Sequence, residues 1–79
     1  MTIDHQRMYR DIVVKLAKID KSQDALSKEL EISRSTIWRL SKSKEISTNN
    51  FFKIIEWIDQ GFERYLIGYV NPSNKSKYL

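Results

Sequence analysis

The chain has 79 residues, with 14 lysines and arginines against 10 acidic residues, a formal net charge of +4 and a pI near 9.5. The absence of cysteine excludes disulfides and thiolate metal sites, and with a single histidine, His5, we expect neither a metal site nor a cofactor. A chain of this length makes one small domain. Its apolar runs are too short to span a membrane, so we expect no membrane contact and a reducing, cytoplasmic location. The positive charge fits a polyanionic partner, although many basic proteins bind none.

Helix breakers are rare in the first two thirds of the chain, because the only ones are Gly61, Gly68 and Pro72. This distribution favours an all-α domain with short turns. Apolar residues at i, i+4 and i+8 predict a first helix over residues 5–18, with Asp4 as its N-cap. The residues expected to face inward are Met8, Ile12, Val13, Leu16 and Ile19.

Two serines mark the starts of the next two helices. Ser22 is the expected N-cap of a second helix, which Leu26 and Leu30 anchor to the core. Ser33 is the expected N-cap of a third helix that runs to about Ser41. Because only two or three residues separate these helices, we expect them to cross at a steep angle.

A fourth helix is predicted in "NNFFKIIEWID", capped by Ser47 or Thr48 and stopped by Gly61. Its repeat predicts an inward stripe made of Phe51, Ile54, Ile55 and Ile58.

The segment "FERYLIGYV" predicts a short fifth helix, although its aromatic and β-branched residues leave a strand as an alternative. Residues 71–79 are polar and predict a flexible C-terminal tail. The expected architecture is therefore a compact all-α bundle of four to five helices, in one domain over residues 1–70.

The spacing of inward residues within 23–40 is the sharpest pattern in the chain. Two short helices joined by a tight turn need apolar residues at fixed offsets, and a small residue where they cross, here Ser27. This is the pattern of a helix-turn-helix, whose second helix lies in the major groove of DNA. The offsets are filled by Leu26, Ser27, Leu30, Ile32, Ile37 and Leu40.

The stretch "SQDALSKELEISRSTIWRL" resembles the Cro- and phage-repressor-like helix-turn-helix family, and "STNNFFKIIEWI" resembles that family's next helix. The resemblance covers roughly residues 8–60. It implies a lambda-repressor-like fold with a bihelical unit at 23–42. It also implies a small phage- or mobile-element-type repressor, nucleoid-associated, that binds a palindromic operator of double-stranded DNA as a dimer. Glu31 replaces the family's turn glycine, so it has to adopt a positive φ.

A helical wheel over residues 34–42 separates a cationic side from an apolar side. The family's base-reading positions fall on Arg34, Ser35 and Arg39, with Trp38 beside them. Arginine can donate two hydrogen bonds to the O6 and N7 atoms of guanine. An Arg-Lys face of this kind can also be ordinary solvated surface, and Trp38 can instead pack against a neighbouring side chain or a partner protomer.

The expected phosphate contacts come from the helix N-termini, from two lysines and from the loop before the fourth helix. Lysine is better suited to phosphates than to bases, because its ammonium is a point charge. Amides at helix N-termini also attract phosphate. The expected contacts are Gln23, Ser33, Thr36, Lys42, Lys44 and Asn49.

Aromatic residues crowd the last two predicted helices, more than one small core easily encloses. Together with the family's dimeric binding, this predicts a two-fold interface, while a thick single-protomer core is the alternative. The residues expected in the interface are Trp57, Phe62, Tyr65, Leu66 and Tyr69.

Two other classes of function fit the sequence less well. A protein-interaction module, such as an antitoxin or anti-repressor, can use the same fold but has no need of the acid-free basic run at 34–44. An enzyme needs convergent titratable groups in a pocket. Here the acids are scattered among lysines and arginines, so we expect no catalytic residues and no small-molecule ligand.

Overall fold

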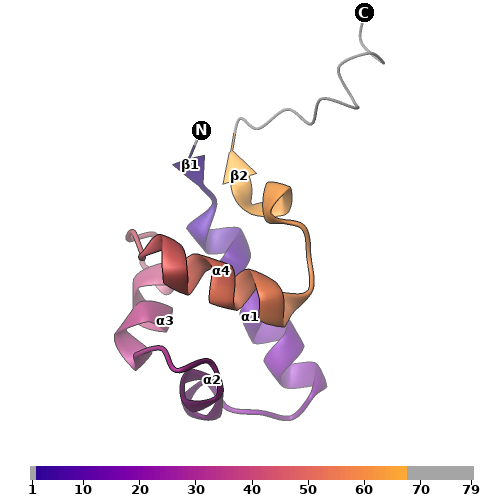
Figure 1. The fold of residues 1–79 in the computed structure, drawn as a ribbon. Coiled ribbons are helices and arrows are strands. Elements are labelled where there is room, and N and C mark those ends of the chain that lie inside the picture. The colour runs from indigo at the N-terminus through magenta and orange to yellow at the C-terminus, as the bar shows by residue number, and fades with distance from the viewer. Residues whose placement is uncertain (1, 68–79) are drawn as a thin grey trace, which may run out of the picture.

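The computed structural model describes residues 2–67, and most of them lie in α-helices. The helices are α1 (His5–Lys18), α2 (Gln23–Leu30), α3 (Arg34–Ser41) and α4 (Thr48–Ile58) (Figure 1). A 3₁₀ turn, η1 (Phe62–Tyr65), follows α4, and two short strands, β1 (Thr2–Ile3) and β2 (Leu66–Ile67), pair with each other. The expected compact and mostly helical character is confirmed for this range, while the expected tail at 71–79 lies outside the described residues.

Each α-helix begins after a side chain that accepts a hydrogen bond from the first turn. This oxygen satisfies one of the amide donors that helix geometry leaves unpaired, and it stabilises the helix by about 1 kcal/mol. The expected N-caps are confirmed, with Ser47 rather than Thr48 before α4. The capping residues are Asp4, Ser22, Ser33 and Ser47, which accept from the backbone N–H groups of Arg7, Ala25, Thr36 and Asn50 respectively.

Two helices end at acidic residues in the left-handed region of the backbone. Glu31 ends α2 with φ 56°, as expected, and Asp59 ends α4 with φ 64°. The expected stop at Gly61 is wrong, because α4 has already ended at Asp59 and Gly61 has an extended backbone with φ −64°. The left-handed region costs a residue other than glycine about 1–2 kcal/mol, so the sequence retains strain at both ends.

A lysine from another helix binds a carbonyl group near each of these two ends. The Lys53 ammonium donates to the carbonyl of Glu31 at 3.3 Å. The Lys15 ammonium donates to the carbonyl of Trp57 and lies 4.5 Å from the centre of the indole ring. Cations at helix C-termini satisfy unpaired carbonyls and complement the helix dipole.

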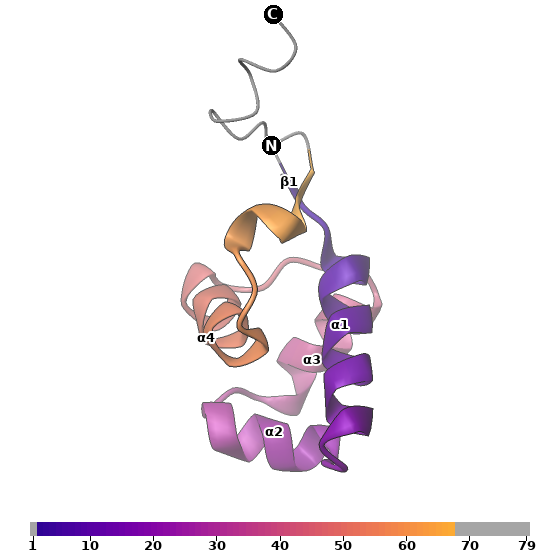
Figure 2. The same cartoon turned by 90° about the vertical axis from the view of Figure 1, so that its right-hand side faces the viewer.

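The core lies between α1 and the other helices, and α1 contacts α3, α4 and η1. Figure 2 shows α1 along one side of the molecule, with α2 crossing near its C-terminal end. The expected inward positions Val13 and Ile19 are wrong, because α1 buries only a narrow i, i+4 stripe and leaves these two side chains 39% and 45% exposed. The buried apolar residues are Met8, Ile12, Leu16, Leu26, Ile32, Ile37, Leu40, Phe51, Ile54, Ile58 and Tyr65.

The segment after α4 joins the two ends of the described range. β1 and β2 are antiparallel, with Thr2 opposite Ile67 and Ile3 opposite Leu66. Within the described part of this segment, residues 62–67, the expected fifth helix is replaced by a single 3₁₀ turn followed by a strand at Leu66–Ile67, where the strand alternative holds. The predicted all-helical fold did not include this pairing. In the structure, the backbone after η1 lies beside Thr2–Ile3, and the two segments pair there.

Candidate nucleic-acid interface

α2 and α3 form a tight pair joined by residues 31–33 alone. α2 is seen end-on in Figure 1, whereas α3 is seen from the side, so the two helices cross steeply. Ser27 is buried at this crossing, and its hydroxyl donates to the carbonyl of Gln23 at 3.1 Å. The backbone N–H of Ile32 donates to the carbonyl of Ser27 at 3.0 Å, and the Ile32 side chain is buried. A small residue at position 27 therefore allows the close approach that the spacing predicted.

α3 has one buried face and one exposed face, as the helical wheel indicated. Thr36, Ile37 and Leu40 are buried against the body of the molecule. The residues expected to read bases are all exposed, and Trp38 is 51% exposed despite its size. The exposed side chains on this helix and at its end are Arg34, Ser35, Trp38, Arg39 and Lys42.

The exposed side chains of α3 differ in how far they are already engaged. Arg34 donates through Nη1 to a carboxylate oxygen of Asp24 at 3.3 Å. Within residues 2–67, the side chains of Arg39 and Lys42 form no hydrogen bond or ion pair. The Lys44 ammonium lies 5.0 Å from the centre of the Trp38 ring. Among the cations from Arg34 to Lys44, Arg39 and Lys42 are thus the ones with the greatest freedom to meet an anionic partner.

Three hydroxyls at the start of α3 belong to a chain of polar groups that ties α3 to α4. The Asn50 amide donates to the Thr36 hydroxyl at 3.3 Å, which lies 3.1 Å from the Ser33 hydroxyl. The Ser33 hydroxyl in turn lies 2.7 Å from that of Ser35. Thr36 was expected to contact phosphate, and this is wrong, because its side chain is buried and its hydroxyl already has two partners.

The remaining expected phosphate contacts lie at the edges of the α2–α3 pair. Gln23 begins α2 and is half-buried, and its amide donates to the Tyr9 hydroxyl at 3.4 Å, rather than capping its own helix. Asn49 is exposed in the first turn of α4. Ser33 is exposed, but its hydroxyl also caps α3.

Two residues that shape this surface were missed. Asp24 holds Arg34 across the turn, and Gln6 in α1 donates to the Ser41 carbonyl at 3.1 Å and to the Ser43 hydroxyl at 2.8 Å. The opposite charges of Asp24 and Arg34, ten positions apart on either side of a tight turn, were a readable signal once the turn was predicted. Nothing in the sequence pattern marks Gln6, whose partners lie more than thirty positions away.

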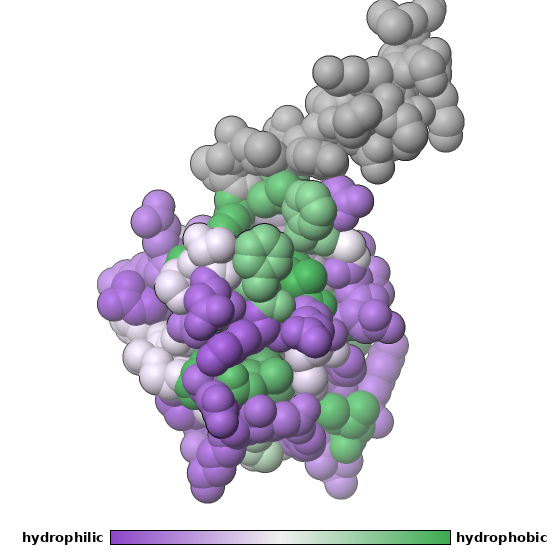
Figure 3. Space-filling view, viewed as in Figure 1, coloured by the Kyte–Doolittle hydropathy of each residue, from purple (hydrophilic) through white to green (hydrophobic). Residues whose placement is uncertain are grey.

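The residues expected in a dimer interface are not all available to a partner. Tyr65 is fully buried within the protomer, so its assignment to the interface is wrong. Phe62 is 42% exposed, Leu66 and Trp57 are half-buried, and Tyr69 lies outside the described residues. Figure 3 shows apolar side chains reaching the surface over α4 and the segment that follows it.

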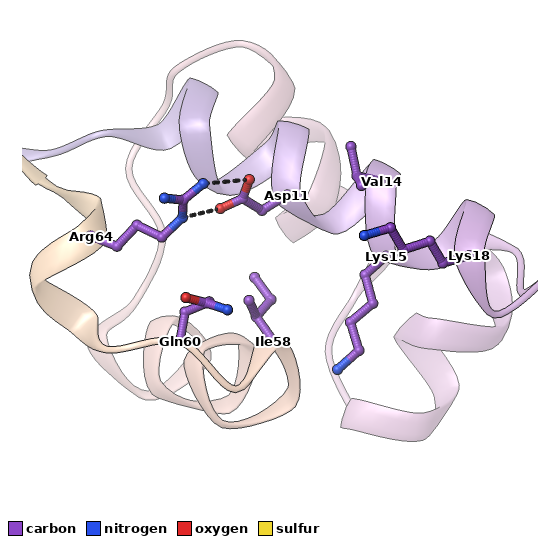
Figure 4. Close-up of a pocket in the computed structure, with 7 residues that line it drawn as sticks. All are labelled: Asp11, Val14, Lys15, Lys18, Ile58, Gln60 and Arg64. Carbon is purple, nitrogen blue, oxygen red and sulfur yellow. Dashed lines mark hydrogen bonds and ion pairs between the residues drawn. The ribbon is translucent and has the colours of Figure 1, made fainter.

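A second polar cluster joins α1 to η1 on a groove lined in part by Val14, Lys18 and Gln60 (Figure 4). Arg64 donates to both carboxylate oxygens of Asp11, at 2.7 Å and 3.3 Å, and the Tyr65 hydroxyl donates to the same carboxylate at 2.7 Å. The hydrogen bond from Arg64 is the main cause that holds the pKa of Asp11 below its usual value. Burial, with the bond to Asp11, raises the pKa of Tyr65 to about 12, so this hydroxyl remains a donor at neutral pH. The charges of Asp11 and Arg64 therefore neutralise each other within the cluster.

Comparisons of the chain with protein-family models, with curated proteins and with solved structures found no match. Within residues 2–67, no three acidic or histidine side chains converge in a way that would hold a metal ion. No helix in the same range combines the length and the apolar character needed to cross a membrane. A function is therefore inferred from the geometry of the α2–α3 pair and from its resemblance in sequence.

Proposed function

We propose that this protein is a sequence-specific transcriptional regulator that binds double-stranded DNA by inserting α3 into the major groove. One observation carries the proposal: α3 is anchored through Thr36, Ile37 and Leu40, while its opposite face presents exposed arginines. From Arg34 to Lys44 the chain has four cations and no acid. A helix held by one side with a cationic side free is the arrangement that groove reading requires.

The exposed side chains of α3 have the chemistry to distinguish base pairs. Arg34 and Arg39 can each donate two hydrogen bonds to guanine, and one such contact discriminates against other bases by about 1–3 kcal/mol. Ser35 both donates and accepts, so it specifies little alone. The apolar face of Trp38 can lie against a thymine methyl group or a sugar.

The neighbouring groups can fix the protein on the DNA backbone without reading sequence. Lys42 and Lys44 follow α3, and Asn49 lies in the first turn of α4. The N-terminal amides of α2, beside Gln23, add a partial positive charge. Such contacts supply affinity that depends on salt, whereas base contacts supply preference.

A homodimer on a palindromic operator is part of the proposal, and repression by occupying a promoter is its simplest mechanism. The supporting observations are the exposed side chain of Phe62, the partly exposed Leu66 and Trp57, and the apolar side chains that Figure 3 shows at the surface over α4 and the segment that follows it. An isologous contact would use the same area on both protomers.

Selection of bound sites from random duplexes, followed by titration of the preferred site at two salt concentrations, tests the proposal. The expected result is a palindrome with half-sites about one helical turn apart, and specific affinity lost in Arg39→Ala with helical content unchanged. Weak binding that is blind to sequence and vanishes near physiological salt would reject groove reading. Sedimentation showing monomers both free and on the preferred duplex would reject the dimer.

A protein-interaction module is the second candidate, and a specific observation favours it. Phe52 and Ile67 are 52% and 54% exposed, and Figure 3 shows apolar side chains at the surface over α4 and the segment that follows it. Exposed apolar side chains that gather on one surface are typical of protein contacts. On this alternative, Phe52→Ser would abolish capture of the partner, whereas Arg39→Ala would leave it intact.

A further inference from the structure

Asp24 connects the two helices of the α2–α3 pair through the side chain of Arg34. Its Oδ1 atom accepts from Nη1 of Arg34 at 3.3 Å, and its Oδ2 atom lies 3.6 Å from the ammonium of Lys28. Each carboxylate oxygen therefore has its own cation, one on α3 and one a turn further along α2. The carboxylate is held from two sides while both it and Arg34 stay more than half exposed.

The contact with Asp24 leaves the part of Arg34 that reads guanine unoccupied. A guanidinium group has five N–H donors in a rigid plane, with two edges that can each form a pair of parallel hydrogen bonds. Asp24 engages only Nη1, so the edge formed by Nε and Nη2 remains available. Guanine offers O6 and N7 in the major groove with the spacing that such an edge matches.

We propose that Asp24 is a positioning residue, which orients the guanidinium of Arg34 and thereby sets its preference for guanine. This inference rests on the proposed function, because it assigns a role within the same DNA-reading surface. An arginine at the start of a helix samples many rotamers, and in most of them it meets a phosphate as readily as a base. A fixed acceptor on the neighbouring helix restricts these rotamers and lowers the entropy lost when the base contact forms.

The role makes a prediction that charge alone does not make. Asp24 is an anion beside a surface that meets polyanionic DNA, so removing its charge favours binding to any sequence. Removing its orienting contact weakens only the discrimination that Arg34 provides. The loss of charge raises the affinity for every duplex, whereas the loss of the contact lowers the affinity for the preferred site alone. A titration with both kinds of duplex therefore separates the two effects. Exposed ion pairs also contribute little to folding stability, so the substitution is expected to leave the fold intact.

The experiment compares the wild type with Asp24→Asn, Arg34→Ala and the double variant. The probes are the duplex selected by the wild type, the same duplex with each base pair changed singly, and a scrambled duplex. The affinities for the singly changed duplexes form a preference profile, and the position at which Arg34→Ala alters this profile identifies the base pair that Arg34 reads. We expect Asp24→Asn, whose uncharged amide oxygen is a weaker acceptor for Arg34, to bind the scrambled duplex more tightly and to lose part of the preference at that base pair. In the Arg34→Ala background, Asp24→Asn should change that preference no further.

Glu29→Gln is the matched control, because Glu29 is also an acid of α2 but pairs with Lys21 instead of Arg34. It removes the same charge and should leave the base preference unchanged. A preferred site with an identical profile in Asp24→Asn, or an equal loss of preference in Glu29→Gln, would overturn the positioning role while leaving the proposed function in place. A wild type that selects no site would overturn the proposed function, and the role of Asp24 with it.

Discussion

At the scale of single residues, Glu31 shows how the chain accepts local strain to form a tight pair of helices. Its backbone lies in the left-handed region with φ 56° and ψ 45°, where a Cβ atom is crowded. The same conformation ends α2, aligns Ile32 for burial and lets α3 start three residues later, at Arg34. The strain is offset in part by the hydrogen bond that the carbonyl of Glu31 accepts from Lys53. Because this carbonyl belongs to the backbone, any residue at this position would keep the bond.

Glu31→Gly is therefore expected to stabilise the protein by about 0.5–1 kcal/mol, because relief of the left-handed strain exceeds the added entropy of the unfolded chain. Urea unfolding followed by circular dichroism measures this change. The same substitution two positions earlier, Glu29→Gly, is the control, and it should destabilise the protein by up to about 1 kcal/mol because Glu29 lies in the last turn of α2 with helical backbone angles. A lower unfolding midpoint for Glu31→Gly would contradict the strain assigned to this turn.

At the scale of elements, α3 is divided into a face that folds and a face that is free to bind. Gln6 ties its end to the start of α1, and Asn50 ties its first turn to α4. With both ends held, the exposed side chains are carried on a rigid element. Substitutions on the exposed face should therefore alter binding while leaving the fold unchanged.

Lys42→Ala is expected to weaken binding to all duplexes alike and to reduce the salt dependence of affinity by about one ion. The reason is that Lys42 follows α3 as an exposed cation, suited to a phosphate. Fluorescence anisotropy at several salt concentrations, on preferred and scrambled duplexes, measures both effects. Lys18→Ala removes a cation from the groove of Figure 4 and should change neither quantity. A loss confined to the preferred duplex would instead make Lys42 a base contact.

The helices and their starts could be predicted because the signals are local. Ser22, Ser33 and Ser47 each lie three residues from the amide that they cap. The errors involve partners remote in sequence. Thr36 was expected to contact phosphate because it lies near a helix N-terminus, but it is buried and its hydroxyl is bound by Asn50 of another helix. Tyr65 was expected at an interface because aromatic residues crowd the last two predicted helices, but it is buried and bound to Asp11, 54 positions away. The helical wheel indicates which side of α3 is buried, but side-chain hydrogen bonds to such distant partners leave no periodic pattern in the sequence.

At the scale of the whole molecule, the Asp11 cluster joins the first helix to the last described segment. Arg64 and Tyr65 both donate to this carboxylate, so η1 is fixed to α1 by charge-assisted hydrogen bonds. The backbone N–H of Asp4 also donates to the carbonyl of Tyr65 at 2.6 Å. These contacts hold η1 against the first helix, α1, so residues far apart in the sequence meet at one end of the molecule.

The pKa of Asp11 predicts how this closure depends on pH. Because the folded-state pKa lies below the unfolded value of about 3.9, the carboxylate stabilises the fold above that value. The stabilisation is lost as the pH falls through the folded-state pKa. Asp11→Asn should therefore unfold at a lower urea concentration than the wild type at neutral pH, and the difference should narrow in acid.

Urea titrations at a series of pH values test this dependence. Glu56→Gln is the control, because Glu56 is exposed and forms no ion pair within residues 2–67. Its unfolding midpoint at neutral pH should equal that of the wild type, so the loss of a negative charge is not by itself what destabilises Asp11→Asn. A gap for Asp11→Asn that is constant with pH would mean that the contacts of Asp11 do not depend on its charge.

The antiparallel pairing of Thr2–Ile3 with Leu66–Ile67 also separates the order of synthesis from the order of docking. Of the described elements, β1 and α1 are synthesised before the others, yet their partners in η1 and β2 emerge only after every other one. The contacts between α2 and α3 lie between neighbouring segments, so they can form as soon as both helices are exposed. Closing a loop that spans nearly the whole described chain costs more entropy than closing a short one. The helix pair proposed to read DNA is thus expected to dock before the molecule has joined its ends.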